Sequence, residues 1–408
     1  MHHFFINDVE TVVHPIDSSN SVTLSIFLDV GLPLESSVEG GISHFLEHMC
    51  FRGTQRRSAY EITKEVDSLG GQVNAYTTKE FTCYYITVLP ESILEGLDIL
   101  MDIVFHSQHA DKNIELEKSI INEEINMYED TPDDKILDLL SSELFNGAYL
   151  GKPILGTASS IGQFSNQVLM NYYLNYRVAK NIKCVVAGAV TELSNLKHQL
   201  QLAFDQVEFT DSSNELPRLD AMSFEKRQAH VYKDLEQMHL CYGYPGLKYT
   251  HADRYALTLL TTLLGGSMSS RLFQSVRERL GLAYSIYCTS QNYRDTGAIV
   301  IYAGTATAQY RKAQDCIEKE IDQLRDGITD DEFERTKRQL KGNMIIHLEG
   351  SSAWANWLGR QLIYKTGLST LIQLQDRLNQ ITKDDVIRLS KSMFSDSVQA
   401  KVSLGNAK

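Results

Sequence analysis

Basic residues are absent from the first part of this chain, and long apolar runs are absent from all of it. No Lys or Arg precedes Arg52, so we expect neither a Sec signal nor an Arg-rich transit peptide at this N-terminus. No apolar run approaches the roughly 18 residues that a membrane span needs. The sequence therefore predicts a cytoplasmic protein without a membrane-spanning segment.

Closely spaced cysteines are absent as well. The six cysteines, at positions 50, 83, 184, 241, 288 and 316, form no C-x-x-C pair and fall mostly in apolar segments. This pattern predicts buried free thiols and argues against a disulfide framework. The net charge of −13 excludes nucleic acid as an expected partner and mildly favours basic peptides.

The length of 408 residues is enough for two domains with substantial cores. A polar stretch from 205 to 223 predicts a linker, and we expect domains at residues 1–212 and 213–408. Each half alternates strand-like and helix-like segments. The strands are predicted at 22–30, 84–89, 183–188, 239–244, 283–290 and 297–303, and the long helices at 92–105, 111–128, 134–145, 193–204 and 330–348.

The most informative segment is His44-Phe45-Leu46-Glu47-His48. On a helix, His44 and His48 lie one turn apart on the same face. This is the H-x-x-E-H arrangement of the inverted zinc peptidases, in which two imidazoles bind the metal and a carboxylate takes a proton from water. Apolar residues around the motif predict a short buried helix, where imidazoles and a carboxylate without partners would be costly. A metal site is therefore favoured over a chance pattern.

Zinc of this type needs a third protein ligand, and the predicted helix at 111–128 offers several acids. Its glutamates are at 115, 117, 123, 124 and 129, and most of such a run is expected to form a solvated face. Glu117 and Glu124 differ from the rest because they lie seven residues, or two turns, apart on one face. If Glu124 binds the metal, Glu117 can support a histidine ligand from behind.

The motif followed by Ser119-Ile120-Ile121-Asn122-Glu123-Glu124-Ile125 resembles the pitrilysin/insulinase family, specifically its mitochondrial-processing-peptidase-like branch. The resemblance implies one Zn²⁺ per chain, with His44, His48 and Glu124 as ligands, Glu47 as the base and Glu117 as the supporting acid. Glu123 remains a competitor for the third ligand position. The family fold is α+β, with two homologous domains, each a largely antiparallel sheet of about six strands with helices packed on one face.

Two further segments carry the resemblance. The segment from Leu69 to Thr77 resembles the family's edge strand, which implies that it pairs with an extended peptide substrate near Asn74 and Ala75. Asn74 then bonds a substrate carbonyl, or alternatively only shapes a turn. In the second half, which has lost the metal motif, Arg277 and Tyr284 match an Arg and a Tyr that hold the substrate carbonyl and the developing oxyanion. The alternative for Arg277 is an ordinary surface charge.

These observations together predict a zinc endopeptidase that cleaves extended or unfolded peptides. The resemblance implies a homodimer, or a heterodimer with a paralogue, in which two chains enclose one chamber. A different class of function, a non-catalytic scaffold or partner subunit, is the alternative. Relatives of that class have eroded zinc motifs, whereas His44, Glu47, His48 and Glu124 are all present here.

Overall fold

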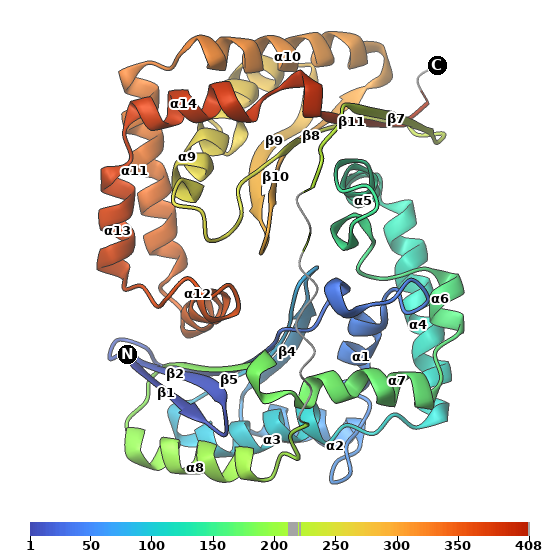
Figure 1. The fold of residues 1–408 in the computed structure, drawn as a ribbon, viewed down its shortest axis with the longest axis vertical. Coiled ribbons are helices and arrows are strands. Elements are labelled where there is room, and N and C mark those ends of the chain that lie inside the picture. Colours follow the sequence, from blue (N-terminus) through green and yellow to red (C-terminus); the bar gives the residue numbers. More distant parts are fainter. Residues whose placement is uncertain (211–218, 220–221, 407–408) are drawn as a thin grey trace. The chain divides into compact units, whose positions relative to one another are not determined.

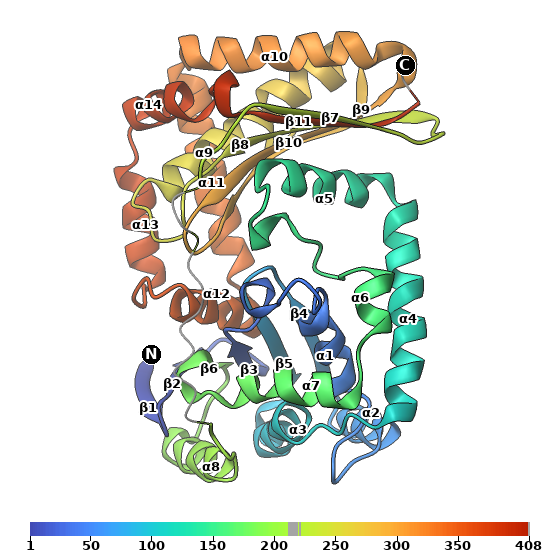
Figure 2. The same cartoon turned by 45° about the vertical axis from the view of Figure 1, so that its right-hand side comes forward.

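The computed structural model describes residues 1–210, 219 and 222–406. The chain divides into two compact units (Figures 1 and 2). Unit 1 contains Met1–Asn126, Pro153–Pro217 and His347–Leu368, and unit 2 contains Met127–Lys152, Arg218–Ile346 and Ser369–Lys408. Each unit thus takes one segment from the other half of the sequence. The predicted domain boundary between residues 212 and 213 lies outside the described residues.

Unit 1 is built on a six-stranded sheet with the order β1-β2-β6-β3-β5-β4. Only β2 and β6 are parallel neighbours, and all other neighbours are antiparallel. The strands are β1 (His2–Ile6), β2 (Val9–Pro15), β3 (Val22–Leu28), β4 (Gln72–Thr77), β5 (Thr82–Val88) and β6 (Ile182–Gly188). The strand β4 lies at one edge of this sheet and has β5 as its neighbour.

Helices cover both faces of the unit 1 sheet, as Figure 1 shows. Alternation along β3 places Leu24 and Ile26 in the main core, on the face that α3 covers. Phe27 and Thr23 point to the opposite face, where α12 packs on β3 and β6. The helices of this unit are α1 (Ile42–Cys50), α2 (Ala59–Ser68), α3 (Ile93–Phe105), α6 (Ala158–Gly162), α7 (Asn166–Tyr173), α8 (Leu193–Asp205) and α12 (Ser351–Ile363).

Unit 2 repeats this plan with a five-stranded sheet in the order β7-β11-β8-β10-β9, where only β7 and β11 are parallel neighbours. The strands are β7 (Arg227–Tyr232), β8 (Gln237–Pro245), β9 (Ala283–Asn292), β10 (Gly297–Ala306) and β11 (Ala400–Gly405). The helices are α5 (Pro132–Leu144), α9 (Arg254–Gly265), a π-helix (Phe273–Arg279), α10 (Tyr310–Asp326), α11 (Asp330–His347), α13 (Leu371–Gln380) and α14 (Lys383–Met393). The helix α5 packs on β8 and β11 (Figure 2).

The structure confirms the α+β fold of two related halves, with sheets of six and five strands. The long helix predicted at 111–128 is α4 (Asp111–Asp130), which continues past the end of unit 1 at Asn126. Five of the six predicted free thiols are buried, and Cys316 is half-buried. Within the described part of the chain, no helix combines the length and hydropathy that crossing a membrane requires.

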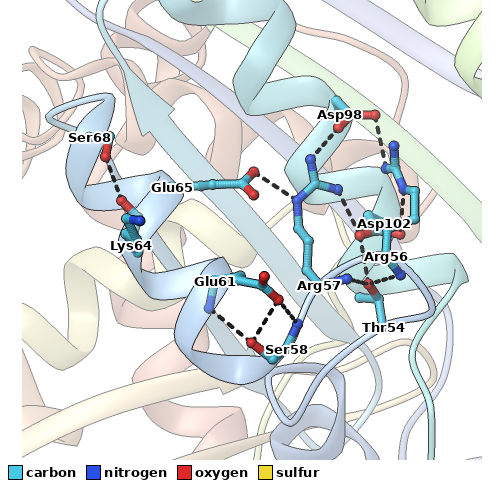
Figure 3. Close-up of polar contacts among 10 residues, drawn as sticks. All are labelled: Thr54, Arg56, Arg57, Ser58, Glu61, Lys64, Glu65, Ser68, Asp98 and Asp102. Carbon is cyan, nitrogen blue, oxygen red and sulfur yellow. Dashed lines mark hydrogen bonds and ion pairs between the residues drawn. The ribbon is translucent and has the colours of Figure 1, made fainter.

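A polar network fixes the loop that follows α1, as Figure 3 shows. The Thr54 hydroxyl donates to Asp102 at 2.7 Å, and Asp102 is fully buried on α3. The Arg57 guanidinium donates to Asp102 at 2.7 Å, to Asp98 at 2.5 Å and to Glu65 of α2 at 2.8 Å. A buried carboxylate with several charge-assisted donors resists displacement. The network therefore holds the segment after α1 against α2 and α3.

Candidate metal centre

The helix α1, which carries the H-x-x-E-H motif, begins at a constrained turn. Gly41 has φ of 90°, and a Cβ at this position would lie 2.5 Å from the Leu155 carbonyl oxygen. The buried Glu35 carboxylate accepts hydrogen bonds from the Gly41 and Ser43 backbone N–H groups at 2.8 and 3.2 Å. It satisfies donors that a helix N-terminus leaves open. The start and rotation of α1 are therefore fixed by residues outside the motif.

Both imidazoles present their Nε2 atoms to one carboxylate. His44 Nε2 lies 3.8 Å from Glu124 Oε1, and His48 Nε2 lies 3.8 Å from Glu124 Oε2. One ligand atom from each of the three residues lies within 4.8 Å of the others. Glu123, the competitor for the third position, points to solvent. The structure thus brings the predicted trio together and places Glu123 outside it.

The second histidine is held from behind by the predicted supporting acid. His48 Nδ1–H donates to Glu117 Oε1 at 2.7 Å, and the side chain of Glu117 is fully buried. The Arg52 Nε–H donates to the other oxygen of Glu117. This pairing places the proton of His48 on Nδ1 and leaves the Nε2 lone pair directed at Glu124.

Glu47 lies between the two histidines in the sequence. Its side chain is buried, and the residue is 9% exposed. Its Oε2 accepts a hydrogen bond from the hydroxyl of Thr77, the last residue of β4. Burial raises the pKa of the Glu47 carboxyl, and the Thr77 hydrogen bond and the charge on His48 offset part of this effect. A carboxylate with a raised pKa close to a metal site is suited to accept a proton.

The surroundings shift the pKa values of the two imidazoles in opposite directions. Burial, with a smaller contribution from the charge on His48, lowers the pKa of His44 to about 3. Burial also opposes the charge on His48, but the hydrogen bond and charge of Glu117 outweigh it and raise the pKa of His48. Burial of Glu117 is likewise outweighed by His48 and Arg52, which lower the pKa of its carboxyl. His44 is therefore neutral at neutral pH, as metal binding requires.

The predicted substrate strand is β4, and it lies at a sheet edge, as the family resemblance implied. Asn74 pairs in register with Tyr85 of β5 and so lies within the strand and not in a turn. Its Oδ1 accepts a hydrogen bond from the Ala75 backbone N–H at 2.8 Å. Asn74 therefore satisfies an amide of the edge strand with its own side chain.

Arg277 and Tyr284 lie beside each other in unit 2. The Arg277 guanidinium carbon lies 5.3 Å from the centre of the Tyr284 ring and 4.7 Å from that of Phe273. Tyr284 is 79% exposed, at the start of the edge strand β9. The structure brings these two predicted residues together, with Tyr284 largely exposed and Arg277 half-buried.

Residues 11–158 match the family model described as Insulinase (Peptidase family M16), and residues 163–340 match the Peptidase M16 inactive domain. The chain is 38% identical over 391 residues to the uncharacterized zinc protease YmxG of Bacillus subtilis, which covers 96% of this chain and 94% of that protein. The chain belongs to the insulinase (M16) family. An uncharacterized zinc protease of Streptomyces coelicolor is 32% identical and covers 94% of this chain and 84% of that protein.

Two solved structures share the fold of this M16 family member. A protease from Helicobacter pylori superimposes with a TM-score of 0.92 at 22% identity and covers 99% of both chains. A peptidase M16 inactive domain from Pseudomonas fluorescens gives a TM-score of 0.91 at 16% identity, over 100% of this chain and 98% of that one. At these identities the likeness shows the fold alone.

The donor set of this M16 chain fits zinc. Two imidazoles and one carboxylate are the ligands of a catalytic zinc site with one open position. In a tetrahedral site with bonds of about 2.1 Å, ligand atoms lie roughly 3.4 Å apart. The 3.8 Å spacings between Glu124 and both imidazoles need only a small contraction to match.

Two residues of the site were not predicted from the sequence, Arg52 and Thr77. Arg52 is the first Lys or Arg of the chain and lies two residues after the end of α1. This positive charge beside the motif could have indicated an acidic partner near the site. Thr77 lies two positions after Ala75, and alternation in a strand places both on the same face. The pairing of each with a glutamate depends on contacts between separate elements.

Proposed function

We propose that this M16 family member is a zinc-dependent endopeptidase of the processing-peptidase-like branch, acting on extended or unfolded peptides. The observation that supports this most strongly is the convergence of His44, His48 and Glu124 beside the buried Glu47. A scaffold function needs none of these groups and gives no reason to bury them together.

The residues of the chain have separate roles in peptide hydrolysis. When bound by His44, His48 and Glu124, zinc lowers the pKa of water and polarises the scissile carbonyl. Glu47 takes the proton from the attacking water and then delivers it to the leaving amine, a contribution typically worth ~10²–10⁴ in rate. Glu117 keeps the His48 tautomer that directs Nε2 at the ligand site.

The edge strand β4 supplies the proposed peptide-binding surface. An extended substrate adds to this edge by main-chain pairing. The Ala75 N–H is bonded to Asn74 Oδ1, so a substrate carbonyl that pairs with this amide replaces the Asn74 oxygen. The Asn74 amide is then available to bond the substrate backbone.

Arg277 and Tyr284 are proposed to hold the peptide carbonyl and its developing negative charge. Both belong to unit 2, whereas the histidine–glutamate group belongs to unit 1. We propose a dimer in which these two side chains of one subunit serve the zinc site of the other. The partner is a second copy of this chain or a paralogue.

The catalytic proposal is tested with Glu47→Gln, which keeps the shape of the side chain and removes the base. Cleavage of a mixed peptide library should fall by ~10²-fold or more. A chelator should abolish cleavage by the wild-type protein, and added zinc should restore it. One zinc per wild-type chain is expected, whereas a scaffold would contain no stoichiometric metal.

The shared site is tested by mixing two inactive proteins. A Glu47→Gln chain mixed with an Arg277→Ala chain should regain part of the wild-type activity, because one site of the mixed dimer keeps both groups. Mixtures as inactive as either parent would contradict the shared site and leave the zinc peptidase proposal standing. The cytoplasmic location stays a prediction.

A further inference from the structure

The last residue of the edge strand, Thr77, links the proposed substrate strand to the proposed base. Its hydroxyl donates to Glu47 Oε2. Its register partner on β5 is Thr82, whose Oγ1 lies 3.4 Å from Thr77 Oγ1. Thr82 is fully buried, and its hydroxyl donates to the Val30 carbonyl at 3.0 Å. A carboxylate only accepts hydrogen bonds, so the proton of the Thr77 hydroxyl is directed at Glu47, while Thr82 uses its own proton for Val30.

A carboxylate at the end of a flexible side chain does not fix its own plane. The terminal torsion of a glutamate is broad and roughly two-fold, so the positions of its two oxygens are set by their partners. Glu47 is 9% exposed, which leaves little water to orient it. A strong hydrogen bond to one oxygen therefore determines where the lone pairs of the other oxygen point.

We propose that Thr77 is a positioning residue for Glu47. Its hydroxyl holds one carboxylate oxygen so that the other faces the attacking water, and it joins the base rigidly to the strand on which the substrate lies. This inference rests on the proposed peptidase function. Thr77 touches neither the water nor the zinc ligands in this role and acts through Glu47 alone.

A second threonine pair in the same sheet provides a matched control. Thr87 of β5 pairs in register with the fully buried Thr23 of β3, and their hydroxyl oxygens lie 2.9 Å apart. Like Thr77, Thr87 is half-buried. The Thr87 hydroxyl, like that of Thr77, lies close to the hydroxyl of a buried threonine on the neighbouring strand. Unlike the Thr77 hydroxyl, it makes no hydrogen bond to Glu47, Glu117 or Glu124 among the described residues.

The experiment compares Thr77→Val, which removes the hydroxyl and keeps the shape, with Thr77→Ser, which keeps the hydroxyl. Thr87→Val is the control, and Thr77→Ala replaces Thr77→Val if the valine variant does not fold. Zinc content, thermal midpoint, kcat and KM are measured for each with an internally quenched peptide. The affinity of the same peptide is measured in the Glu47→Gln background, where cleavage is slow enough for binding to be measured separately.

We expect Thr77→Val to lower kcat by about tenfold or more, a part of the ~10²–10⁴ that base catalysis supplies. The KM, the zinc content and the peptide affinity in the Glu47→Gln background should stay within about twofold of the parent. Thr77→Ser should keep most of kcat, and Thr87→Val should keep all of it. In the Glu47→Gln background, Thr77→Val should change the residual rate by less than about twofold, because the residue acts through Glu47.

Three results would overturn the positioning role: a kcat of Thr77→Val equal to that of Thr87→Val, a Thr77→Ser variant as slow as Thr77→Val, or additive losses in the double variant. The failure of the proposed function looks different. In that case the zinc-loaded wild-type protein itself cleaves no peptide, whereas failure of the positioning role leaves wild-type cleavage intact.

Discussion

The two units have the same sheet plan and differ in the chemistry of the helix that follows the equivalent strand. In unit 1, α1 follows β3 and carries His44, Glu47 and His48. In unit 2, α9 follows β8 and contains neither His nor Glu; its buried positions are mostly Leu, Ala and Thr. The fold therefore does not need a metal site at this place. The comparison indicates that the polar groups of α1 serve function and not the architecture.

One feature of the site nevertheless has a counterpart in both units. After α1, Arg52 pairs with Glu117 of α4, and after α9, Arg271 pairs with Glu332 of α11. The second pair is bidentate, with N–O distances of 2.8 and 2.9 Å. An arginine–glutamate pair thus ties the segment after this helix to a long helix in each unit. In unit 1 alone the glutamate also bonds a histidine, so the same structural device supports the metal site.

The largest expected effect is the loss of zinc and activity on substitution of Glu124, compared with substitution of its neighbour Glu123. It tests whether the metal is held by the proposed ligands of unit 1. Glu124→Gln removes a ligand, so bound zinc should fall far below one per chain and peptidase activity by ~10²-fold or more. Glu123→Gln removes an exposed charge one residue away and should leave both near the wild-type values. Metal analysis and peptide cleavage measure the effect. Loss of zinc from the Glu123 variant with retention in the Glu124 variant would exchange the two roles.

The next effect concerns the helices that each unit takes from the other half of the sequence. A Cβ at Gly359 of α12 would lie 2.1 Å from the Phe27 ring of β3, so Gly359→Ala should destabilise unit 1 by about 1–3 kcal/mol. Leu140 of α5 is buried against the sheet of unit 2, and Leu140→Ala should cost about 2–5 kcal/mol there. Denaturant unfolding measures both. A neutral result at either position would show that the exchanged helix is not part of that core.

A smaller effect distinguishes the two arginine–glutamate pairs. Arg52→Ala leaves Glu117 without one donor and loosens its hold on His48, so the zinc dissociation constant should rise about 10–100-fold. Arg271→Ala breaks the matched pair in unit 2 and should change stability without changing zinc affinity. Competition with a metal chelator measures the first quantity and thermal unfolding the second. Equal zinc affinities of the two variants would show that the Arg52 pair only stabilises the fold.

The smallest effect is the pH dependence of the pair in unit 2. Burial opposes the charge of Glu332, but hydrogen bonds from Arg271 and Thr329 outweigh it and hold the pKa at about 2, below the ordinary 4.5. A depressed folded pKa gives stability that is present above pH 4.5 and is lost as the pH falls toward 2. Because the pair is partly exposed, the loss should be about 1 kcal/mol or less. Glu332→Gln should flatten the stability curve in this window; an unchanged slope would exclude the pair as its cause.

The parts of the site that lie close together in the sequence were predictable. Helical spacing alone places His44 and His48 on one face, and apolar residues around them indicate a buried helix. The third ligand was harder, because Glu123 and Glu124 are adjacent and either satisfies the spacing argument. Resemblance favoured Glu124, and the rotation of α4 leaves Glu123 in solvent.

The placement of α5 and α12 and the partners of Arg52 and Thr77 could not be read from the neighbouring sequence. Both α5 and α12 show an apolar face, but such a face does not state which sheet it will cover. The structure places α5 on the sheet of unit 2 and α12 on that of unit 1, across the order of the sequence. The roles of Arg52 and Thr77 likewise depend on partners 65 and 30 residues away.

The sequence by itself placed the two imidazoles on one helix face, because helical spacing acts over a few residues, and its resemblance to a known family implied the α+β class with two related halves. Only the tertiary structure decided which acid meets the imidazoles, which hydroxyl holds Glu47 and which helix covers which sheet. Those choices depend on how separate elements pack, and many packings satisfy the same local pattern.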